Sequence, residues 1–214
     1  SCYILNTQEN CPDIVFTANA GFVQDDTFIL SNFANQERKA EEPIFEKWFA
    51  DRGYDIHKLS YKYEGEGDHL VDARGRHWLG TGFRTQYEAS YELSGILNKE
   101  ILVLDLVSPK FYHLDTCFCP LPNGELLWYP EAFSESSRKL VCESFHTRVE
   151  VDMIDAMMFS CNAIALEDTI ILPRNNYCSV NLQDIGYCVT ELDLSEFLKA
   201  GGAAKCLVLK LGFN

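Results

Sequence analysis

Hydrophobic and polar positions follow two spacings along the chain, and these spacings predict a repeating order of elements. Runs rich in β-branched and aromatic residues predict strands at 14–17 and 27–30, with a turn between them. From 42 to 52 the apolar residues lie at helical spacing, and Gly53 marks the end of that helix. Residues 55–59 return to a strand pattern. The first unit therefore has the order strand, strand, helix, strand.

The same order recurs three more times. The further units cover 69–71, 77–80, 85–97 and 101–107, then 111–118, 126–129, 131–144 and 149–151, then 163–166, 169–172, 180–185 and 187–192. Thr85 to Glu88 form a capping-box pattern before the second helix. A last strand is predicted at 206–211, and a fifth unit would have to be built from it and residues 1–10.

Polar or thiol residues recur near the beginnings of these units at intervals of 44 to 49 residues. A ring of ββαβ units would bring such positions together around one axis, as radial repeats do. The recurring positions are Asn19, Asp68, His113, Asn162 and Cys206. The predicted fold class is therefore α/β, with the chemistry near the centre of the ring.

Composition and charge narrow the classes of protein. With 214 residues, 47% of them hydrophobic and 23% charged, the chain has the composition of one globular domain or two small ones. Acidic residues outnumber basic ones 32 to 18, and the formal charge of -14 argues against a nucleic-acid or membrane partner. No apolar run approaches the roughly 18 residues that span a bilayer. Nine cysteines without an export signal predict reduced thiols and a cytoplasmic location.

The segment from Glu64 to Asp68 holds three carboxylates, those of Glu64, Glu66 and Asp68, and two glycines between them. The glycines let the backbone approach a ligand closely, which suits a binding site for a small cation. The alternative is an acidic loop that faces solvent.

A histidine and a carboxylate lie two residues apart in the predicted strand 111–118. Alternate residues of a strand share one face, so His113 and Asp115 should point the same way. A histidine beside a carboxylate can act as a general acid and base near neutral pH. The alternative is a histidine that only satisfies hydrogen bonds in the core.

Cys206 follows a loop of small residues, 200–205, at the start of the last predicted strand. A thiol on such a loop suits a nucleophile, because neighbouring groups can tune its pKa. The alternative is a buried core cysteine. Cys117 and Cys119 form a close pair, but no further ligand stands at metal-binding spacing, so we predict no metal site.

Two other polar residues have both a functional and a purely structural interpretation. Arg84 is either a surface cation or an anchor for a carboxylate, since the guanidinium fork matches that group. Asn19 is either a turn residue or an amide that hydrogen-bonds a guanidinium.

Four segments resemble the guanidine-modifying enzyme superfamily. They are Pro12 to Gly21 (PDIVFTANAG), Glu64 to Asp68 (EGEGD), Phe111 to Leu121 (FYHLDTCFCPL) and Glu196 to Leu207 (EFLKAGGAAKCL). The chain is most similar to the arginine dihydrolase branch, which is related to arginine deiminase and dimethylarginine dimethylaminohydrolase. The resemblance extends over nearly the whole chain from Cys11 onward. It implies the pentein fold, a five-bladed α/β propeller of ββαβ units, with 1–214 as a single domain that lacks part of the usual N-terminal segment and has a shortened fifth blade.

The resemblance also implies roles for individual residues. Cys206 would be the nucleophile and His113 the general acid and base, while the carboxylate of Glu64 would grip the guanidinium. The residues implied in substrate binding are Asn6, Asn19, Asp68, Arg84, Asp115 and Gly202. Glu66 stands where relatives usually carry a small residue, so either glutamate of the acidic loop is a candidate for the catalytic one. No metal or organic cofactor is implied.

The implied activity is hydrolysis of L-arginine to ornithine, ammonia and carbon dioxide through a covalent thiouronium intermediate on Cys206. An alternative is an arginine deiminase or dimethylarginine dimethylaminohydrolase that stops at citrulline. Deiminases that resemble this chain carry aspartate in place of Asn19, so Asn19 favours the dihydrolase branch. A second alternative is a non-catalytic remnant that only binds its ligand. The expected partner is a small molecule, arginine or a substituted arginine.

Overall fold

The regular part of the molecule consists of four three-stranded sheets. The computed structural model describes residues 2–6 and 8–212. In each sheet the first two strands pair antiparallel, and the third strand, which follows a helix, pairs parallel to the second. All four units have the predicted ββαβ order, but the first strand of the first unit lies at 21–24 and not at the predicted 14–17.

The elements have the following bounds. The first unit comprises β1 (Gly21–Gln24), β2 (Thr27–Leu30), α1 (Glu42–Ala50) and β3 (Asp55–Lys58). The second comprises β4 (His69–Val71), β5 (His77–Thr81), α2 (Ala89–Leu97) and β6 (Ile101–Asp105). The third comprises β7 (Phe118–Pro120), β8 (Leu126–Trp128), α3 (Glu135–Ser144) and β9 (Arg148–Glu150). The fourth comprises β10 (Ile164–Leu166), β11 (Thr169–Pro173), α5 (Cys178–Asp184) and β12 (Cys188–Leu192), and two short helices are α4 (Met153–Met157) and α6 (Ser195–Lys199).

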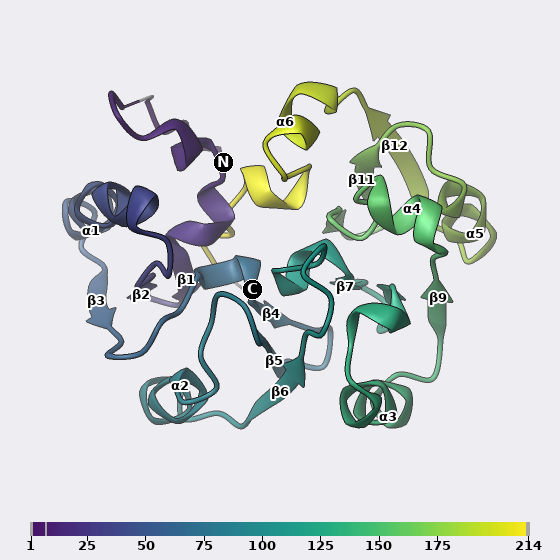
Figure 1. Cartoon of the computed structure of the whole chain (residues 1–214), viewed down its shortest axis with the longest axis horizontal. Helices are drawn as coiled ribbons and strands as arrows, with labels where there is room; N and C mark the ends of the chain where they lie inside the picture. Colours follow the sequence, from purple (N-terminus) through teal and green to yellow (C-terminus); the bar gives the residue numbers. More distant parts are fainter. Residues whose placement is uncertain (1, 7, 213–214) are drawn as a thin grey trace.

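The four units lie around a common centre, with α1, α2, α3 and α5 at the periphery (Figure 1). The N-terminal segment, in purple, and the C-terminal segment, in yellow, lie between the first and the fourth unit (Figure 1). The chain therefore returns to its starting point after four units.

Three segments predicted as strands form tight 3-10 turns instead. Residues 14–17 lie in η1 (Pro12–Val15) and η2 (Thr17–Ala20), 111–118 contain η5 (Leu114–Thr116), and 206–211 begin in η7 (Lys205–Leu207). In the first segment the N–H groups of Ile14, Phe16 and Asn19 donate to nearby backbone carbonyls, whereas the other two segments also use buried side-chain acceptors. The N–H of Leu114 donates to Asp68 Oδ1 (3.1 Å), and that of Cys206 donates to Asn162 Oδ1 (3.2 Å). Such side-chain acceptors compete with a strand ladder for the backbone, and here they replace it.

The predicted capping box of the second helix is also wrong. α2 begins at Ala89, and no side chain caps its first turn. Thr85 instead belongs to the acidic loop, because its hydroxyl donates to Asp68 Oδ2 (2.7 Å) and accepts from the backbone N–H of Glu64 (3.1 Å).

Large apolar side chains fill the space between neighbouring units. Trp78 of β5 is fully buried, and its ring centroid lies 5.4 Å from those of Phe118 and Phe145 in the third unit. Burying one such phenylalanine stabilises the fold by roughly 1.5–3 kcal/mol. The sheets are therefore held to one another by packing rather than by shared strands.

A separate apolar cluster lies where the two ends of the chain meet. Phe28 of β2 stacks on Phe49 of α1 with ring centroids 3.6 Å apart. Leu5 from the N-terminal segment and Leu209 and Leu211 from the C-terminal segment pack against this cluster. Both ends of the chain thus contribute to the core of the first unit.

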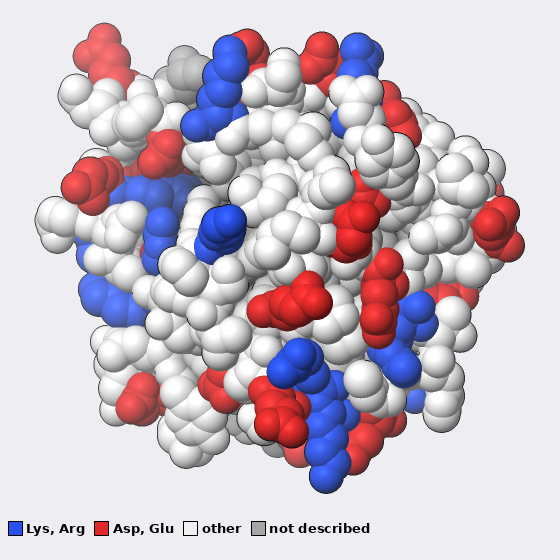
Figure 2. Space-filling model, turned by 45° about the vertical axis from the view of Figure 1, so that its right-hand side comes forward, with Lys and Arg blue, Asp and Glu red and all other residues white. Residues whose placement is uncertain are grey.

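Charged side chains of both signs are interspersed on the face shown in Figure 2. Exposed ion pairs such as Lys47–Asp51 (2.9 Å) contribute at most about 1 kcal/mol each. Among the described residues, no helix combines the length and the apolar character needed to cross a membrane.

Candidate active site

Four turns from different parts of the chain pack together near the centre of the ring. They are η2, η4 (Gly65–Gly67), η5 and η7. A hydrogen bond from Asn19 Nδ2 to the Glu64 carbonyl (3.4 Å) joins η2 to the start of η4. Asn162, from the fourth unit, donates from Nδ2 to the Asp115 carbonyl in η5 (3.2 Å). The predicted gathering of Asn19, Asp68, His113, Asn162 and Cys206 around one centre is thus seen in the structure.

Cys206 is buried and held between an amide and a carboxylate. Its thiol donates to Asp115 Oδ2 (3.3 Å) and accepts from Asn162 Nδ2 (3.1 Å). Asn162 Oδ1 also accepts from the backbone N–H groups of Ala203 and Cys206, so it fixes the turn that carries the thiol. Burial and then the charge of Asp115 raise the pKa of Cys206 well above its ordinary value. Burial and the neighbouring carboxylate thus both favour the thiol form of Cys206 over the thiolate.

His113 pairs with a carboxylate, but not with the one expected from its sequence neighbourhood. His113 Nε2 lies 2.7 Å from Glu64 Oε2, and both side chains are buried. His113 itself has extended backbone, and the chain then turns into η5, so Asp115 reaches Cys206 instead. Burial lowers the pKa of His113, but the negative charges of Asp68 and Glu64 outweigh it and raise the pKa above 6.5. This histidine is therefore suited to hold a proton near neutral pH.

The two glutamates of the acidic loop have different partners. Burial raises the pKa of Glu64, but the hydrogen bond and charge of His113, together with Arg84, outweigh it and lower the pKa to about 2. Glu66 points elsewhere, with Oε2 2.7 Å from Lys205 Nζ. The structure thus places Glu64, and not Glu66, beside the histidine.

Asp68 lies behind the pocket and supports it. Its Oδ2 accepts from the Thr85 hydroxyl (2.7 Å) and its Oδ1 accepts from the Leu114 N–H (3.1 Å). Burial raises the pKa of Asp68 to about 7, although the charge of His113 opposes this. Asp68 is thus a supporting residue that fixes the start of η5.

Asn19 binds a guanidinium that sequence reasoning did not single out. Arg38, in η3 (Gln36–Glu41), donates from NH1 to Asn19 Oδ1 at 2.8 Å. The same guanidinium pairs with Glu41 (2.7 Å) and lies over the ring of Phe33, 4.4 Å from its centroid. Arg38 is 5% exposed, and nothing in its local sequence distinguishes it from a surface arginine. Its position next to Asn19 makes it a further site residue.

Arg84 lies at the rim of the pocket. Its NH1 is 3.2 Å from Glu64 Oε2, and its guanidinium carbon lies 4.7 Å from the ring centroid of Tyr112. Tyr112 in turn donates its hydroxyl to the Gly201 carbonyl (2.9 Å), which ties η5 to the loop before Cys206. Arg84 is thus placed where it can meet a ligand that enters the pocket.

Four of the nine predicted site residues line the pocket: Asn19, Arg84, His113 and Cys206. Glu64 and Asp115 are buried and contact His113 and Cys206. The pocket as a whole is lined by Asp13, Phe16, Asn19, Asn35, Arg38, Arg84, Tyr112, His113, Ala200, Gly201 and Cys206. Asn6 is exposed and is not among these lining residues. Gly202 lies behind the wall, because a Cβ there would come within 2.5 Å of the Phe16 ring. Within the described part of the chain, no group of three or more His, Cys, Asp or Glu side chains could hold a metal ion.

Replacing Gly65 by alanine is expected to destabilise the protein by about 2–3 kcal/mol. Gly65 has φ +55°, and a Cβ there would lie 2.5 Å from the Gly21 carbonyl oxygen, so backbone would have to move. Gly95→Ala is the matched control, since this glycine lies in α2 with nothing within 4 Å of its Cβ position. The control should gain about 0.5–1 kcal/mol. Chemical denaturation measures both values, and a Gly65→Ala variant as stable as the wild type would contradict the role of this turn.

Comparison with known proteins gives several relatives, although no protein-family model matches the chain. The chain is 43% identical to the bifunctional arginine dihydrolase/ornithine cyclodeaminase AgrE of Nostoc sp., over 97% of its own length and 30% of that protein. It is 34% identical to the N(G),N(G)-dimethylarginine dimethylaminohydrolase of Mycobacterium tuberculosis, over 94% of this chain and 66% of the relative. This chain therefore spans less than a third of AgrE.

Solved structures agree with these relatives. The N-terminal domain of ArgZ, an arginine dihydrolase from the ornithine-ammonia cycle in cyanobacteria, matches with a TM-score of 0.94 and 42% identity, over 96% of this chain and 77% of that one. That structure contains bound product, and another structure of the domain contains a covalently bound reaction intermediate. Fold and site together define an α/β protein of the pentein class. The chain belongs to the guanidine-modifying enzyme superfamily, within its arginine dihydrolase branch.

Proposed function

We propose that this chain hydrolyses the guanidinium group of L-arginine to ornithine, ammonia and carbon dioxide. The observation that carries the proposal is the 3.3 Å contact of Cys206 Sγ with Asp115 Oδ2, in a pocket that His113 also lines. A thiol, a carboxylate and a protonated histidine in one buried pocket suit covalent catalysis at a cationic carbon. The relatives AgrE and ArgZ, which are named as arginine dihydrolases, support the same assignment.

The carboxylates of Glu64 and Asp115 would hold the planar cation. Asp115 Oδ1 is buried and has no hydrogen-bond partner among the described residues, so it is available to a guanidinium N–H. The arriving positive charge would oppose the effect of Asp115 on the thiol and lower the pKa of Cys206. Binding of the substrate would thus help to create its own nucleophile. Arg84, at the rim, would meet the carboxylate of the substrate.

The covalent steps follow from these positions. As the substrate binds, the Cys206 thiol would release its proton to solvent, and the thiolate Sγ would bond to the guanidinium carbon. His113 would protonate the departing amine as the C–N bond breaks, which releases the first ammonia. His113 would then take a proton from the water that attacks the thiouronium carbon, and the C–S bond would break to release citrulline. A second round at the ureido carbon would release ornithine, carbon dioxide and a second ammonia.

Incubation of the purified chain with L-arginine tests the proposal, with Cys206→Ala as the inactive control. We expect ornithine and two ammonia for each arginine consumed, measured by amino-acid chromatography and an ammonia assay. Citrulline alone would place the chain with the deiminases or dimethylarginine dimethylaminohydrolases. No product from folded protein would favour a non-catalytic remnant that only binds its ligand.

Asn19→Asp should separate the first two outcomes. A carboxylate at this position would attract Arg38 and the substrate more strongly than the amide does, and deiminases that resemble this chain carry it. We expect the ratio of citrulline to ornithine to rise by at least about tenfold. Asn35→Asp, at an exposed residue on the pocket wall, is the control for added negative charge. An unchanged ratio in Asn19→Asp would contradict the assigned role of Asn19.

Membership of the guanidine-modifying enzyme superfamily also supports a finer description of the fold. We propose that residues 1–214 form a single domain in which the four ββαβ units are blades of a five-bladed α/β propeller. Leu5, Leu209 and Leu211 pack against the first unit, and this supports a shortened fifth blade built from the two ends of the chain. We also propose a cytoplasmic location, because all nine cysteines are unpaired thiols in the structure.

A further inference from the structure

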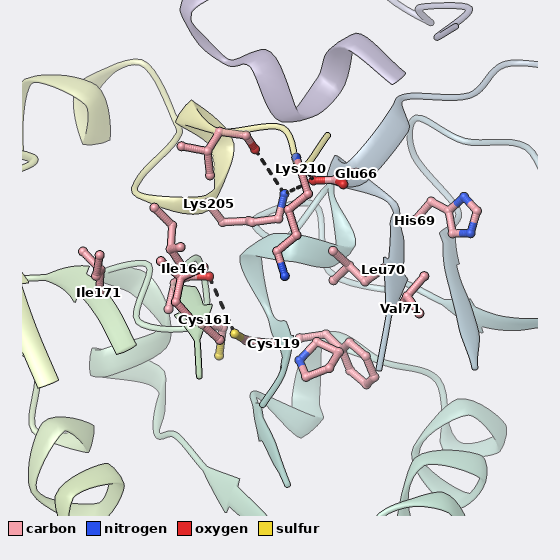
Figure 3. A pocket seen from close by; sticks show the side chains of 16 residues that line it. Glu66, His69, Leu70, Val71, Cys119, Cys161, Ile164, Ile171, Lys205 and Lys210 are labelled. Atoms are coloured by element: carbon pink, nitrogen blue, oxygen red, sulfur yellow. Dashed lines mark hydrogen bonds and ion pairs between the residues drawn. The ribbon is translucent and has the colours of Figure 1, made fainter. Parts of the chain in front are cut away.

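The residue next to the nucleophile in the sequence is a buried lysine that lines a cavity other than the substrate pocket. Lys205 is 8% exposed and precedes Cys206 in η7. It lines a second cavity of about 260 Å³ together with Glu66, as Figure 3 shows. Burying a lysine costs several kcal/mol unless its charge is paired. A lysine kept in this position therefore calls for a role beyond packing.

The lysine joins the turn of the nucleophile to the acidic loop. Its Nζ lies 2.7 Å from Glu66 Oε2 and 3.3 Å from the Val208 carbonyl. The backbone N–H of Lys210 donates to the same Glu66 oxygen at 3.3 Å. Glu66 in η4 thus binds η7 and the segment after it, while Glu64, two residues earlier, faces His113.

The ion pair with Glu66 holds the charge of Lys205 within electrostatic range of Asp115 and Cys206. Burial lowers the pKa of Lys205, but Glu66, Asp115 and Cys206 outweigh it and raise the pKa, so the ammonium form persists. Burial raises the pKa of Asp115, and the charges of His113 and Lys205 oppose this effect. The titratable and charged side chains around Cys206 are Asp13, Arg38, Glu64, Glu66, Asp68, Arg84, Tyr112, His113, Asp115 and Lys205.

We propose that Lys205 is a positioning residue for the nucleophile: its ammonium, held by Glu66, fixes η7 and supplies the charge that favours the thiolate of Cys206. The inference deepens the proposed function, since it rests on Cys206 as the attacking group. Glu66 thereby gains a purpose that differs from that of Glu64. It anchors the lysine rather than the substrate.

The test compares Lys205→Met, Lys205→Arg and the double variant Glu66→Gln/Lys205→Met. The rate at which iodoacetamide alkylates Cys206 is followed at about pH 8 by peptide mass spectrometry, where it reflects thiolate fraction and nucleophilicity together. Loss of the ammonium should slow alkylation at least about threefold. A rise of one unit in the pKa of Cys206 lowers its thiolate fraction about tenfold, but the thiolate that remains is more nucleophilic and partly compensates. Lys205→Arg retains the charge and should stay within about twofold of the wild type.

The double variant separates the effect of the Lys205 charge on the alkylation of Cys206 from the effect of the ion pair on the stability of the protein. It removes the unpaired Glu66 carboxylate that Lys205→Met leaves buried, so its Tm should return toward that of the wild type while alkylation stays slow. Lys199→Met is the matched control, because Lys199 pairs with Glu196 at the same 2.7 Å but both groups are exposed. It should shift Tm by no more than about 4 °C and leave kcat and the alkylation rate within about twofold of the wild type.

Two results would overturn the inference. One is folded Lys205→Met with wild-type alkylation, and the other is a double variant that regains both Tm and alkylation rate, which would make the pair merely structural. Alkylation needs no substrate, so it decides the role of Lys205 even for a chain that does not turn over arginine. With turnover, we expect Lys205→Met to lower kcat at least about tenfold and to leave KM within about threefold.

Discussion

Replacing Cys206 by serine is expected to lower arginine turnover at least about 10³-fold while the fold is retained. A serine hydroxyl keeps the hydrogen-bond partners that hold the thiol, Asp115 Oδ2 at 3.3 Å and Asn162 Nδ2 at 3.1 Å. It ionises far less readily than a thiol, and the negative Asp115 beside it disfavours an alkoxide further. The variant should therefore bind arginine and fail to form the covalent adduct.

Mass spectrometry of protein quenched during turnover provides the measurement beside product analysis. The wild type should show the mass of a covalent adduct on the peptide that contains Cys206, and Cys206→Ser should not. Cys188→Ser is the matched control, because this cysteine is exposed on β12. Turnover by Cys206→Ser within about tenfold of the wild type would show that another group attacks the substrate.

The order of the elements is predictable from the sequence because strands and helices of this protein have different local periods. β11 was expected at 169–172 and spans Thr169–Pro173, and α5 was expected at 180–185 and spans Cys178–Asp184. In both cases residues near in sequence bury one face against the same neighbours. A repeated local pattern is enough to predict elements of this kind.

The central turns are not predictable in this way, because distant residues decide their conformation. Residues 111–118 are apolar and aromatic like a strand, but the N–H of Leu114 binds Asp68, 46 positions away in the sequence. The N–H of Cys206 binds Asn162, which is 44 positions away. The polar residues at the centre of the ring were recognisable from their spacing, whereas the shape of the backbone around them was not.

Buried cations escape sequence analysis for a related reason. Arg38 and Lys205 look like surface residues in a chain that holds 18 basic side chains. Arg38 is buried against Asn19 and Glu41, and Lys205 pairs with Glu66 across 139 positions of sequence. Only the fold brings Arg38 to Asn19 and Lys205 to Glu66. The choice between Glu64 and Glu66 therefore also required the structure.

The negative charge of Glu64 is expected to set the pH dependence of kcat through its effect on His113. The hydrogen bond and the charge of Glu64 help to raise the pKa of His113. In the proposed mechanism His113 must hold a proton when the amine departs. In Glu64→Gln the charge is gone, and the amide N–H can donate to His113 Nε2 and favour the neutral ring. We expect kcat at neutral pH to fall about 10²–10⁴-fold, with an alkaline limb that moves to lower pH.

The sign of this shift distinguishes the role of Glu64 from simple substrate binding. A group whose pKa is raised stays protonated to higher pH, so loss of the raising charge must make the protonated form of His113 disappear earlier as pH rises. Profiles of kcat against pH for the wild type, Glu64→Gln and Glu37→Gln, an exposed control, provide the test. A lower kcat with an unmoved alkaline limb would assign Glu64 to the substrate alone. An alkaline limb that moves to lower pH would show that Glu64 acts through His113, because a carboxylate that only grips the cation has no reason to change the proton affinity of the histidine.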